Sequence, residues 1–206
     1  MLTEPIIKRA HVFIDGQNLF HSVKEAFGYT YPNYNIRRLV SKTASSYNWK
    51  IQSIRFYTGI PDEKDDPTWH RFWIKKLSAM GRQGIKVFSR PLRYRNQTIQ
   101  LPGGEAHTFL VGEEKGVDVR LALDIVRTVR TEPSDVIVVF SQDQDLSEVA
   151  DEIRLIAAEK KRWIKIVSVF PVSAKFKNTR GINKTDWIHI DRGLYDSCID
   201  THDYRM

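Results

Sequence analysis

Short runs of apolar residues alternate along this chain with longer segments in which apolar residues recur at helical spacing. The short runs predict buried strands, and the longer segments predict amphipathic helices. Strands are predicted at residues 11–14, 51–58, 84–88, 135–140, 163–170 and 187–190. Helices are predicted at residues 19–27, 36–44, 67–80, 117–130 and 146–161, with a helical tail after residue 191. Strands that alternate with helices form parallel βαβ units, so the pattern predicts an α/β fold with a mainly parallel sheet covered on both faces.

Turn-forming residues divide these segments. Gly28 ends the first helix, and Asn35 is placed to cap the second. Residues 94–101, interrupted by Asn96-Gln97 and closed by Pro102-Gly103-Gly104, predict a protruding hairpin. The helix at residues 67–80 carries several aromatic rings, which we interpret as a core-facing side rather than a base-stacking platform. The hairpin and this helix are also candidate contacts for a homodimer.

Acidic residues follow two of the predicted strands. Asp15 comes directly after the first strand, and Asp143 and Asp145 follow Ser141 after the strand at residues 135–140. In parallel sheets the ligand crevice lies beyond the carboxyl ends of the strands, so the fold sends both groups to one edge. Asp118 opens the helix at residues 117–130. The candidate site therefore combines carboxylates from distant parts of the chain.

Each of these aspartates also has a purely structural interpretation. Asp15 before Gly16 is typical of a turn, and an aspartate at the start of a helix caps free N–H groups. Two carboxylates as close as Asp143 and Asp145 raise each other's proton affinity unless a cation offsets the repulsion, which favours a metal site. Asn18 lies one turn after Asp15, where it can contact substrate or hold a carboxylate.

Two further residues near Asp118 have different interpretations. Asp124 lies at ion-pair spacing from Arg120 and Arg127, so we interpret it as structural. Lys115 is either a solvated lysine or, beside a carboxylate cluster, a contact for phosphate.

Composition narrows the class of protein. The 206 residues suffice for one domain, expected to span residues 1–206 with its core at about 10–190 and a short C-terminal tail. The single cysteine excludes an internal disulfide and a thiolate zinc cluster, and the six histidines show no zinc spacing. Carboxylates without such ligands suit Mg²⁺ or Mn²⁺. The absence of a signal-peptide core and of a membrane-length apolar run favours a cytoplasmic protein with no membrane contact.

The chain carries a formal net charge of +7 and has a pI of about 9.5, which favours a polyanionic partner. Phe176 lies in a basic loop and is a candidate for stacking on a base. A solvated basic loop is the plainer interpretation of the same segment. The candidate RNA-binding residues in the hairpin and in this loop are Arg93, Arg95, Lys175, Lys177, Arg180 and Lys184.

Several separate motifs occur in one order along the chain. They are Phe13-Ile14-Asp15-Gly16-Gln17-Asn18, Tyr57-Thr58-Gly59, Arg90-Pro91-Leu92, Lys115-Gly116-Val117-Asp118-Val119 and Ser141-Gln142-Asp143-Gln144-Asp145-Leu146. The chain resembles NYN-domain proteins of the LabA-like group, which belong to the PIN-like ribonuclease superfamily. The resemblance spans roughly residues 10 to 190.

The resemblance implies a PIN-like three-layer α/β/α sandwich and metal-dependent cleavage of RNA, with 5′-phosphate and 3′-hydroxyl products. Single-stranded RNA is the expected substrate, because its exposed backbone can enter a narrow acidic pocket. It implies that Asp15, Asp118, Asp143 and Asp145 form the metal pocket, supported by Asn18 and Ser141. In such a site we expect Lys115, or a second metal ion, to offset charge that develops on the phosphate oxygens. One residue departs from the family pattern, since Gln142 stands where the family usually has glycine.

Three alternatives remain open from the sequence. A non-catalytic RNA-binding or scaffold protein would keep this fold, and a bulky Gln142 in the site is a reason to consider it. A phosphatase with Asp15 as nucleophile is disfavoured, because such enzymes normally carry a second aspartate where this chain has Gln17. A DNA nuclease would use the same metal chemistry. The natural RNA and its base preference are not encoded in any motif.

Overall fold

The computed structural model describes residues 3–100, 104–175 and 177–205. Its centre is a six-stranded sheet in the order β3-β2-β1-β6-β7-β8, in which every neighbouring pair is parallel. The strands are β1 (Lys8–Asp15), β2 (Trp49–Ile60), β3 (Lys86–Pro91), β6 (Val136–Phe140), β7 (Lys165–Pro171) and β8 (Asp186–Ile190). The predicted parallel sheet is confirmed.

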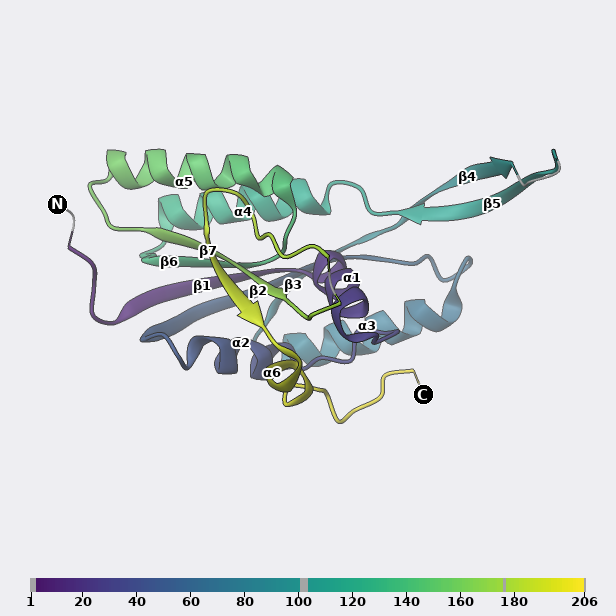
Figure 1. Ribbon diagram of the computed structural model, residues 1–206, viewed down its shortest axis with the longest axis horizontal. Coiled ribbons are helices and arrows are strands. Elements are labelled where there is room, and N and C mark those ends of the chain that lie inside the picture. Colours follow the sequence, from purple (N-terminus) through teal and green to yellow (C-terminus); the bar gives the residue numbers. More distant parts are fainter. Residues whose placement is uncertain (1–2, 101–103, 176, 206) are drawn as a thin grey trace.

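Helices cover both faces of this sheet (Figure 1). One face carries α1 (Gly16–Phe27), α2 (Ile36–Ala44), α3 (Pro67–Arg82) and α6 (Arg192–Asp196). The other face carries α4 (Val117–Thr131) and α5 (Ser147–Glu159), the latter preceded by the short 3₁₀ helix η1 (Gln144–Leu146). The three-layer α/β/α arrangement predicted from the resemblance is therefore observed.

The helix boundaries follow from local chemistry. Asp15 caps α1 by accepting a hydrogen bond from the backbone N–H of Asn18, and Gly28 ends the helix with a left-handed φ of 82°. Asn35 caps α2 in the same way, as predicted, and Asp66 caps α3 ahead of Pro67. No helix among the described residues has both the length and the apolar character that crossing a membrane requires.

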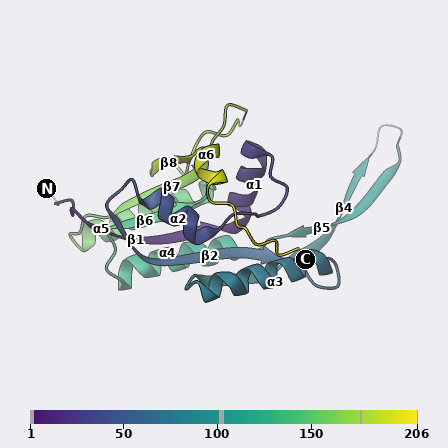
Figure 2. The same cartoon turned by 90° about the horizontal axis from the view of Figure 1, so that it is seen from below.

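The hairpin differs from its prediction. Its strands are β4 (Arg93–Gln100) and β5 (Ala106–Glu113), which pair in antiparallel register. Asn96 and Gln97 lie inside β4 and do not form a turn, and the second strand was not predicted. Both strands are largely exposed, so burial leaves no alternating pattern to recognise. The hairpin projects from the edge of the sheet at which the strands end (Figures 1 and 2). Residues 101–103 of the predicted turn lie outside the described part of the chain, as does Phe176.

Strand register brings the motifs together at that edge. Asp15 pairs with Tyr57 of β2, and Ile14 pairs with Phe140, the last residue of β6. The residues that follow each strand, Gly16 after β1 and Ser141 after β6, therefore emerge side by side.

Gly16 is packed so closely against β2 that a methyl group at this position would clash with it. A Cβ there would lie 2.5 Å from a ring carbon of Phe56 and 2.8 Å from the backbone oxygen of Tyr57. We expect Gly16→Ala to destabilise the fold by about 1–3 kcal/mol, measured by denaturant unfolding. The matched control is Gly81→Ala in α3, where a Cβ meets open space, and its expected effect ranges from none to a gain of about 1 kcal/mol. Equal stabilities for the two variants would contradict this account of the α1 N-terminus.

Candidate active site at the carboxyl edge of the sheet

Asp15 lies at the junction of β1 and α1, and both of its carboxylate oxygens are engaged. Oδ1 accepts the backbone N–H of Asn18 at 3.0 Å, and Oδ2 accepts the hydroxyl of Ser141 at 3.2 Å. The Asn18 side chain in turn accepts the backbone N–H of Gln142 at 2.9 Å. These bonds fasten the end of β1 to the segment that follows β6, and they hold the Asp15 side chain in one orientation.

The segment after β6 is ordered by its own polar side chains. The Ser141 hydroxyl accepts the backbone N–H of Asp143 at 3.1 Å, so it bridges Asp15 and Asp143. The Asp143 carboxylate accepts the backbone N–H of Asp145 at 3.0 Å and caps η1. Asp145 is exposed and joins this group through its main chain. The structure thus places Asp15, Asn18, Ser141 and Asp143 together, with Asp145 at the rim.

A second pair of acids approaches from the start of α4. Asp118 lies in the first turn of α4 and is exposed, and its charge acts on Asp15. Glu114, four residues earlier, accepts the backbone N–H of Gly59 at the end of β2. A Cβ on Gly59 would meet the ends of the Leu92 and Glu114 side chains, so these side chains would have to shift to accept one.

Glu114 was not recognised from the sequence. The missing information was the second strand of the hairpin, which ends at Glu113 and delivers Glu114 to the site. Its position immediately before the Lys115-Gly116 motif was the available clue.

Two of these acids, Asp15 and Glu114, have raised pKa values. Burial, together with the charges of Asp143 and Asp118, raises the pKa of Asp15 to about 6 against the lowering effect of its two hydrogen bonds. Burial likewise raises the pKa of Glu114 to about 7, with contributions from Asp15 and Asp118. A divalent cation would relieve this repulsion, and the oxygen donors suit Mg²⁺ or Mn²⁺. Within residues 3–100, 104–175 and 177–205, however, no three or more His, Cys, Asp or Glu side chains are already gathered around one ion position.

Gln142 is buried and points away from the carboxylates. Its amide oxygen accepts the Ser22 hydroxyl of α1 at 3.0 Å, and its amide nitrogen donates to the carbonyls of Asn178 and Arg180 at 3.0 and 2.9 Å. The non-glycine residues with positive φ in the described part of the chain are Lys161 and Lys184, so Gln142 does not strain its turn. Gln142 therefore fastens the basic loop to the site.

Gln144 makes a second attachment to the same loop. Its amide nitrogen donates to the carbonyl of Gly181 at 3.0 Å, and its amide oxygen accepts the backbone N–H of Asn183 at 3.1 Å. The loop between β7 and β8 is thus bound at four backbone positions to the segment that carries Ser141 and Asp143.

The cationic residues differ in how free they are to bind phosphate. Lys184 forms an ion pair with Asp151, and Arg95 forms one with Glu113. The remaining candidates are exposed, and these are Arg93, Lys115, Lys175, Lys177 and Arg180. Arg90 was not selected as a site residue, yet its guanidinium packs against Gly116, two residues from Asp118.

Asp124 has the structural role expected from its spacing. It accepts hydrogen bonds from the Tyr57 hydroxyl at 3.0 Å and from Arg120 at 2.9 Å. These contacts tie α4 to β2 below the candidate site.

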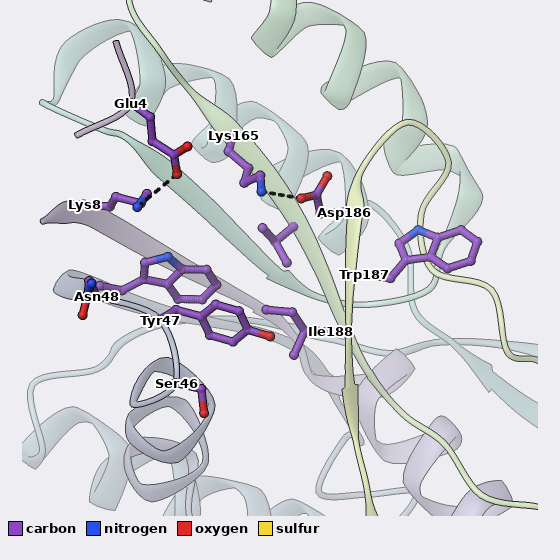
Figure 3. Close-up of a pocket in the computed structure, with 11 residues that line it drawn as sticks. Glu4, Lys8, Ser46, Tyr47, Asn48, Lys165, Asp186, Trp187 and Ile188 are labelled. Carbon is purple, nitrogen blue, oxygen red and sulfur yellow. Dashed lines mark ion pairs between the residues drawn. The ribbon is translucent and has the colours of Figure 1, made fainter. Parts of the chain in front are cut away.

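Two cavities lie at opposite edges of the sheet. One, of about 380 Å³, is lined by Gly16, Gln17 and Gly59 beside the carboxylates. The other, of about 300 Å³, lies where β1, β2, β7 and β8 begin (Figure 3). Its lysines, Lys8 and Lys165, are paired with Glu4 and Asp186 respectively, which leaves little charge for a ligand.

A parallel α/β/α sandwich with acids gathered at the carboxyl edge is consistent with the PIN-like class of proteins. The sequence model of the NYN domain matches residues 9–179, and the chain therefore belongs to the NYN family of this superfamily. NYN domains are generally nucleases, so membership carries a nuclease-like, RNA-related function.

Solved structures add information about the fold alone. The crystal structure of VPA0982, a protein of unknown function from Vibrio parahaemolyticus, matches with a TM-score of 0.55 at 16% identity, covering 93% of this chain and 98% of that one. Ribokinase from Giardia lamblia matches with a TM-score of 0.38 at 10% identity, over 84% of this chain and 53% of its own, too weakly to support an argument. A search among curated proteins gives no match.

The raised pKa of Asp15 predicts how stability depends on pH without added metal. A folded-state pKa of about 6, above the ordinary value of 3.8, means that ionisation opposes folding, and this cost grows as pH rises from about 4 to above 6. We expect Asp15→Asn to be more stable than the wild type at pH 7, by up to about 3 kcal/mol, and to show no such gain at pH 4. Denaturant unfolding across this pH range measures the difference.

The control variant for this experiment should change stability in the opposite direction. Arg9 lowers the pKa of Asp135 through hydrogen bonds and charge, so Asp135→Asn should lose stability at neutral pH.

Adding Mn²⁺ should stabilise the wild type more than Asp15→Asn, because the ion binds the folded state. An Asp15→Asn variant with the pH profile of the wild type would contradict the assigned environment.

Proposed function

We propose that this chain is a metal-dependent endoribonuclease that hydrolyses phosphodiester bonds of single-stranded RNA. The observation that carries the proposal is the arrangement around Asp15. Its carboxylate is held by Asn18 and Ser141 beside Asp143, and its pKa is raised by burial and by the neighbouring acids. Family membership supports the same class of chemistry.

Asp15, Asp118 and Asp143 are the proposed ligands for Mg²⁺ or Mn²⁺, with Asp145 acting directly or through water. Glu114 is a further candidate, because its carboxyl responds to the charges of Asp15 and Asp118. When bound, such an ion supplies an activated water and offsets negative charge on the phosphate.

The other site residues position these groups. Ser141 and Asn18 hold the Asp15 carboxylate, and Asn18 also fixes the backbone of Gln142. Lys115 is exposed two residues before Val117 and is proposed to contact the phosphate being cleaved. Single-stranded RNA suits the site because its backbone can enter a narrow acidic cleft.

RNA is proposed to run over the exposed cations at the same edge. Lys175 and Lys177 are exposed in a loop that Gln142 and Gln144 hold against the site. Arg93 and Arg180 are exposed as well, whereas Arg95 and Lys184 would have to exchange their present partners for phosphate.

Substitutions in the acid cluster test the catalytic proposal. Asp15→Asn and Asp143→Asn should abolish Mn²⁺-dependent cleavage of a labelled single-stranded RNA, since each removes a proposed metal ligand. Asn18→Ala should reduce the rate about 10- to 100-fold, because it releases groups that support a ligand. Asp65→Asn, an exposed aspartate ahead of α3, is the control and should cleave normally.

The same assay distinguishes the rival function. A wild-type chain that binds RNA but does not cleave it with Mn²⁺ or Mg²⁺ would be a non-catalytic RNA-binding protein. An active Asp15→Asn variant would remove the assignment of Asp15. Cleavage of a matched DNA oligonucleotide at the same rate would widen the substrate to both nucleic acids.

Charge removal in the basic loop tests the path of the RNA. We expect the double variant Lys175→Ala and Lys177→Ala to lower the slope of log affinity against log salt by about 1.4, or about 0.7 for each phosphate that a lysine no longer neutralises. The control is the double variant Lys42→Ala and Lys50→Ala, which removes the same charge from exposed positions on α2 and β2. An unchanged slope in the loop variant would exclude this loop from the RNA path.

A further inference from the structure

The cavity lined by Gly16 and Gly59 has walls from five separate parts of the chain. It measures about 380 Å³, which is within the usual range of small-ligand pockets. Its walls come from α1, from the loop after α1, from the end of β2, from the start of α3 and from the base of the hairpin. The lining residues used below are Gln17, Phe20, His21, Lys24, Thr30 and Trp69.

Helix α1 presents one side to this cavity. Gln17, Phe20, His21 and Lys24 stand at positions i, i+3, i+4 and i+7, which form one stripe on a helix. The core-facing residues of α1 are different ones, namely Leu19, Ser22, Val23, Ala26 and Phe27. Phe20 is therefore an aromatic residue that the core does not use, placed between polar and cationic side chains.

Helix α3 contributes a second partly exposed ring to the lining. Trp69 is partly buried and meets Phe72 edge-on, with the ring centroids 5.0 Å apart. Phe72 and Trp73 are buried in the core, as the sequence predicted for this helix face. Trp69 is thus held in place by the core while it borders the cavity.

The cavity is lined by residues that adjoin the acid cluster. Gly16 and Gln17 follow Asp15 directly in the chain, and Gly59 donates its backbone N–H to Glu114. Lys24 lies about 10 Å along α1 from Gln17, at the far end of the stripe. A strand whose phosphate meets the acids can therefore place its neighbouring nucleotide against this wall.

We propose that this cavity binds the base and ribose of a nucleotide adjacent to the cleaved bond, with Phe20 and Trp69 contacting the base and Lys24 the backbone. The inference rests on the proposed function and names a subsite for its RNA substrate. Gln17 and Thr30 supply hydrogen-bonding groups within the same walls. Aromatic rings accept any base through its π face, so the subsite favours unpaired RNA rather than one sequence.

Binding measured without cleavage tests the subsite. Fluorescently labelled RNA hexamers are titrated in the presence of a chelator, so that the result is independent of catalysis. We expect Phe20→Ala and Phe20→Leu to weaken binding roughly 5- to 100-fold, because both remove the stacking ring. Phe20→Tyr retains the ring and should bind like the wild type. Tyr47→Ala is the control, because Tyr47 is an exposed aromatic residue that lines the cavity at the other edge of the sheet.

A modified substrate gives a second readout. Hexamers with a single abasic nucleotide, moved along the strand, should lose affinity at one position in the wild type. The same hexamers should show no further loss in Phe20→Ala, since the ring that the base contacts is gone. Thermal unfolding of each variant verifies that the fold is intact, as expected for a side chain outside the core.

The outcomes separate the two proposals. Wild-type affinity in both Phe20→Ala and Phe20→Leu overturns the subsite while leaving the nuclease proposal in place. Position-dependent binding through Phe20, without cleavage when Mn²⁺ is added, supports the subsite and overturns the nuclease proposal. No binding of RNA by the wild type overturns both.

Discussion

The parallel pairing of β1 with both β2 and β6 is the constraint on which the candidate site depends. It places the ends of three strands side by side, so that Asp15 meets Ser141 and pairs with Tyr57 although these residues are distant in the chain. Asp15 then serves two purposes, because its carboxylate caps α1 and accepts the Ser141 hydroxyl. The same hydrogen bonds that begin the helix also orient the acid at the centre of the site.

Repulsion between acidic side chains is concentrated at the carboxyl edge of the sheet. The chain carries a net charge of +7, yet at this edge burial, and after it the charges of neighbouring acids, raise the pKa of Asp15 and Glu114. Such repulsion costs stability unless a cation or a basic partner offsets it. A basic protein that concentrates acids at one edge has the charge distribution expected for the proposed binding of a polyanion around a metal ion.

The departure of Gln142 from the usual glycine has a structural explanation. Its side chain fills the space between α1 and the loop after β7, where it forms hydrogen bonds with Ser22, Asn178 and Arg180. In place of a flexible glycine, Gln142 therefore supplies a side chain that holds the loop after β7. Gln144 holds the same loop through two further hydrogen bonds. Lys175 and Lys177 are consequently carried on a loop whose far end is fixed to the site.

The amino-acid pattern alone determined most of the secondary structure, the parallel α/β/α fold and the edge at which Asp15, Ser141 and Asp143 gather. These features are predictable because the spacing of apolar residues indicates which side chains are buried, and because parallel strands all end at the same edge of a sheet. The tertiary structure alone decided four further features. They are the exposed β5 strand, the approach of Glu114 to Gly59, the anchoring by Gln142 and the joint lining of one cavity by Phe20 and Trp69. Each of these features brings two segments into contact, and the local pattern of one segment does not indicate which other segment it will contact. Contact between distant side chains depends on sheet register and on how the helices pack across the sheet.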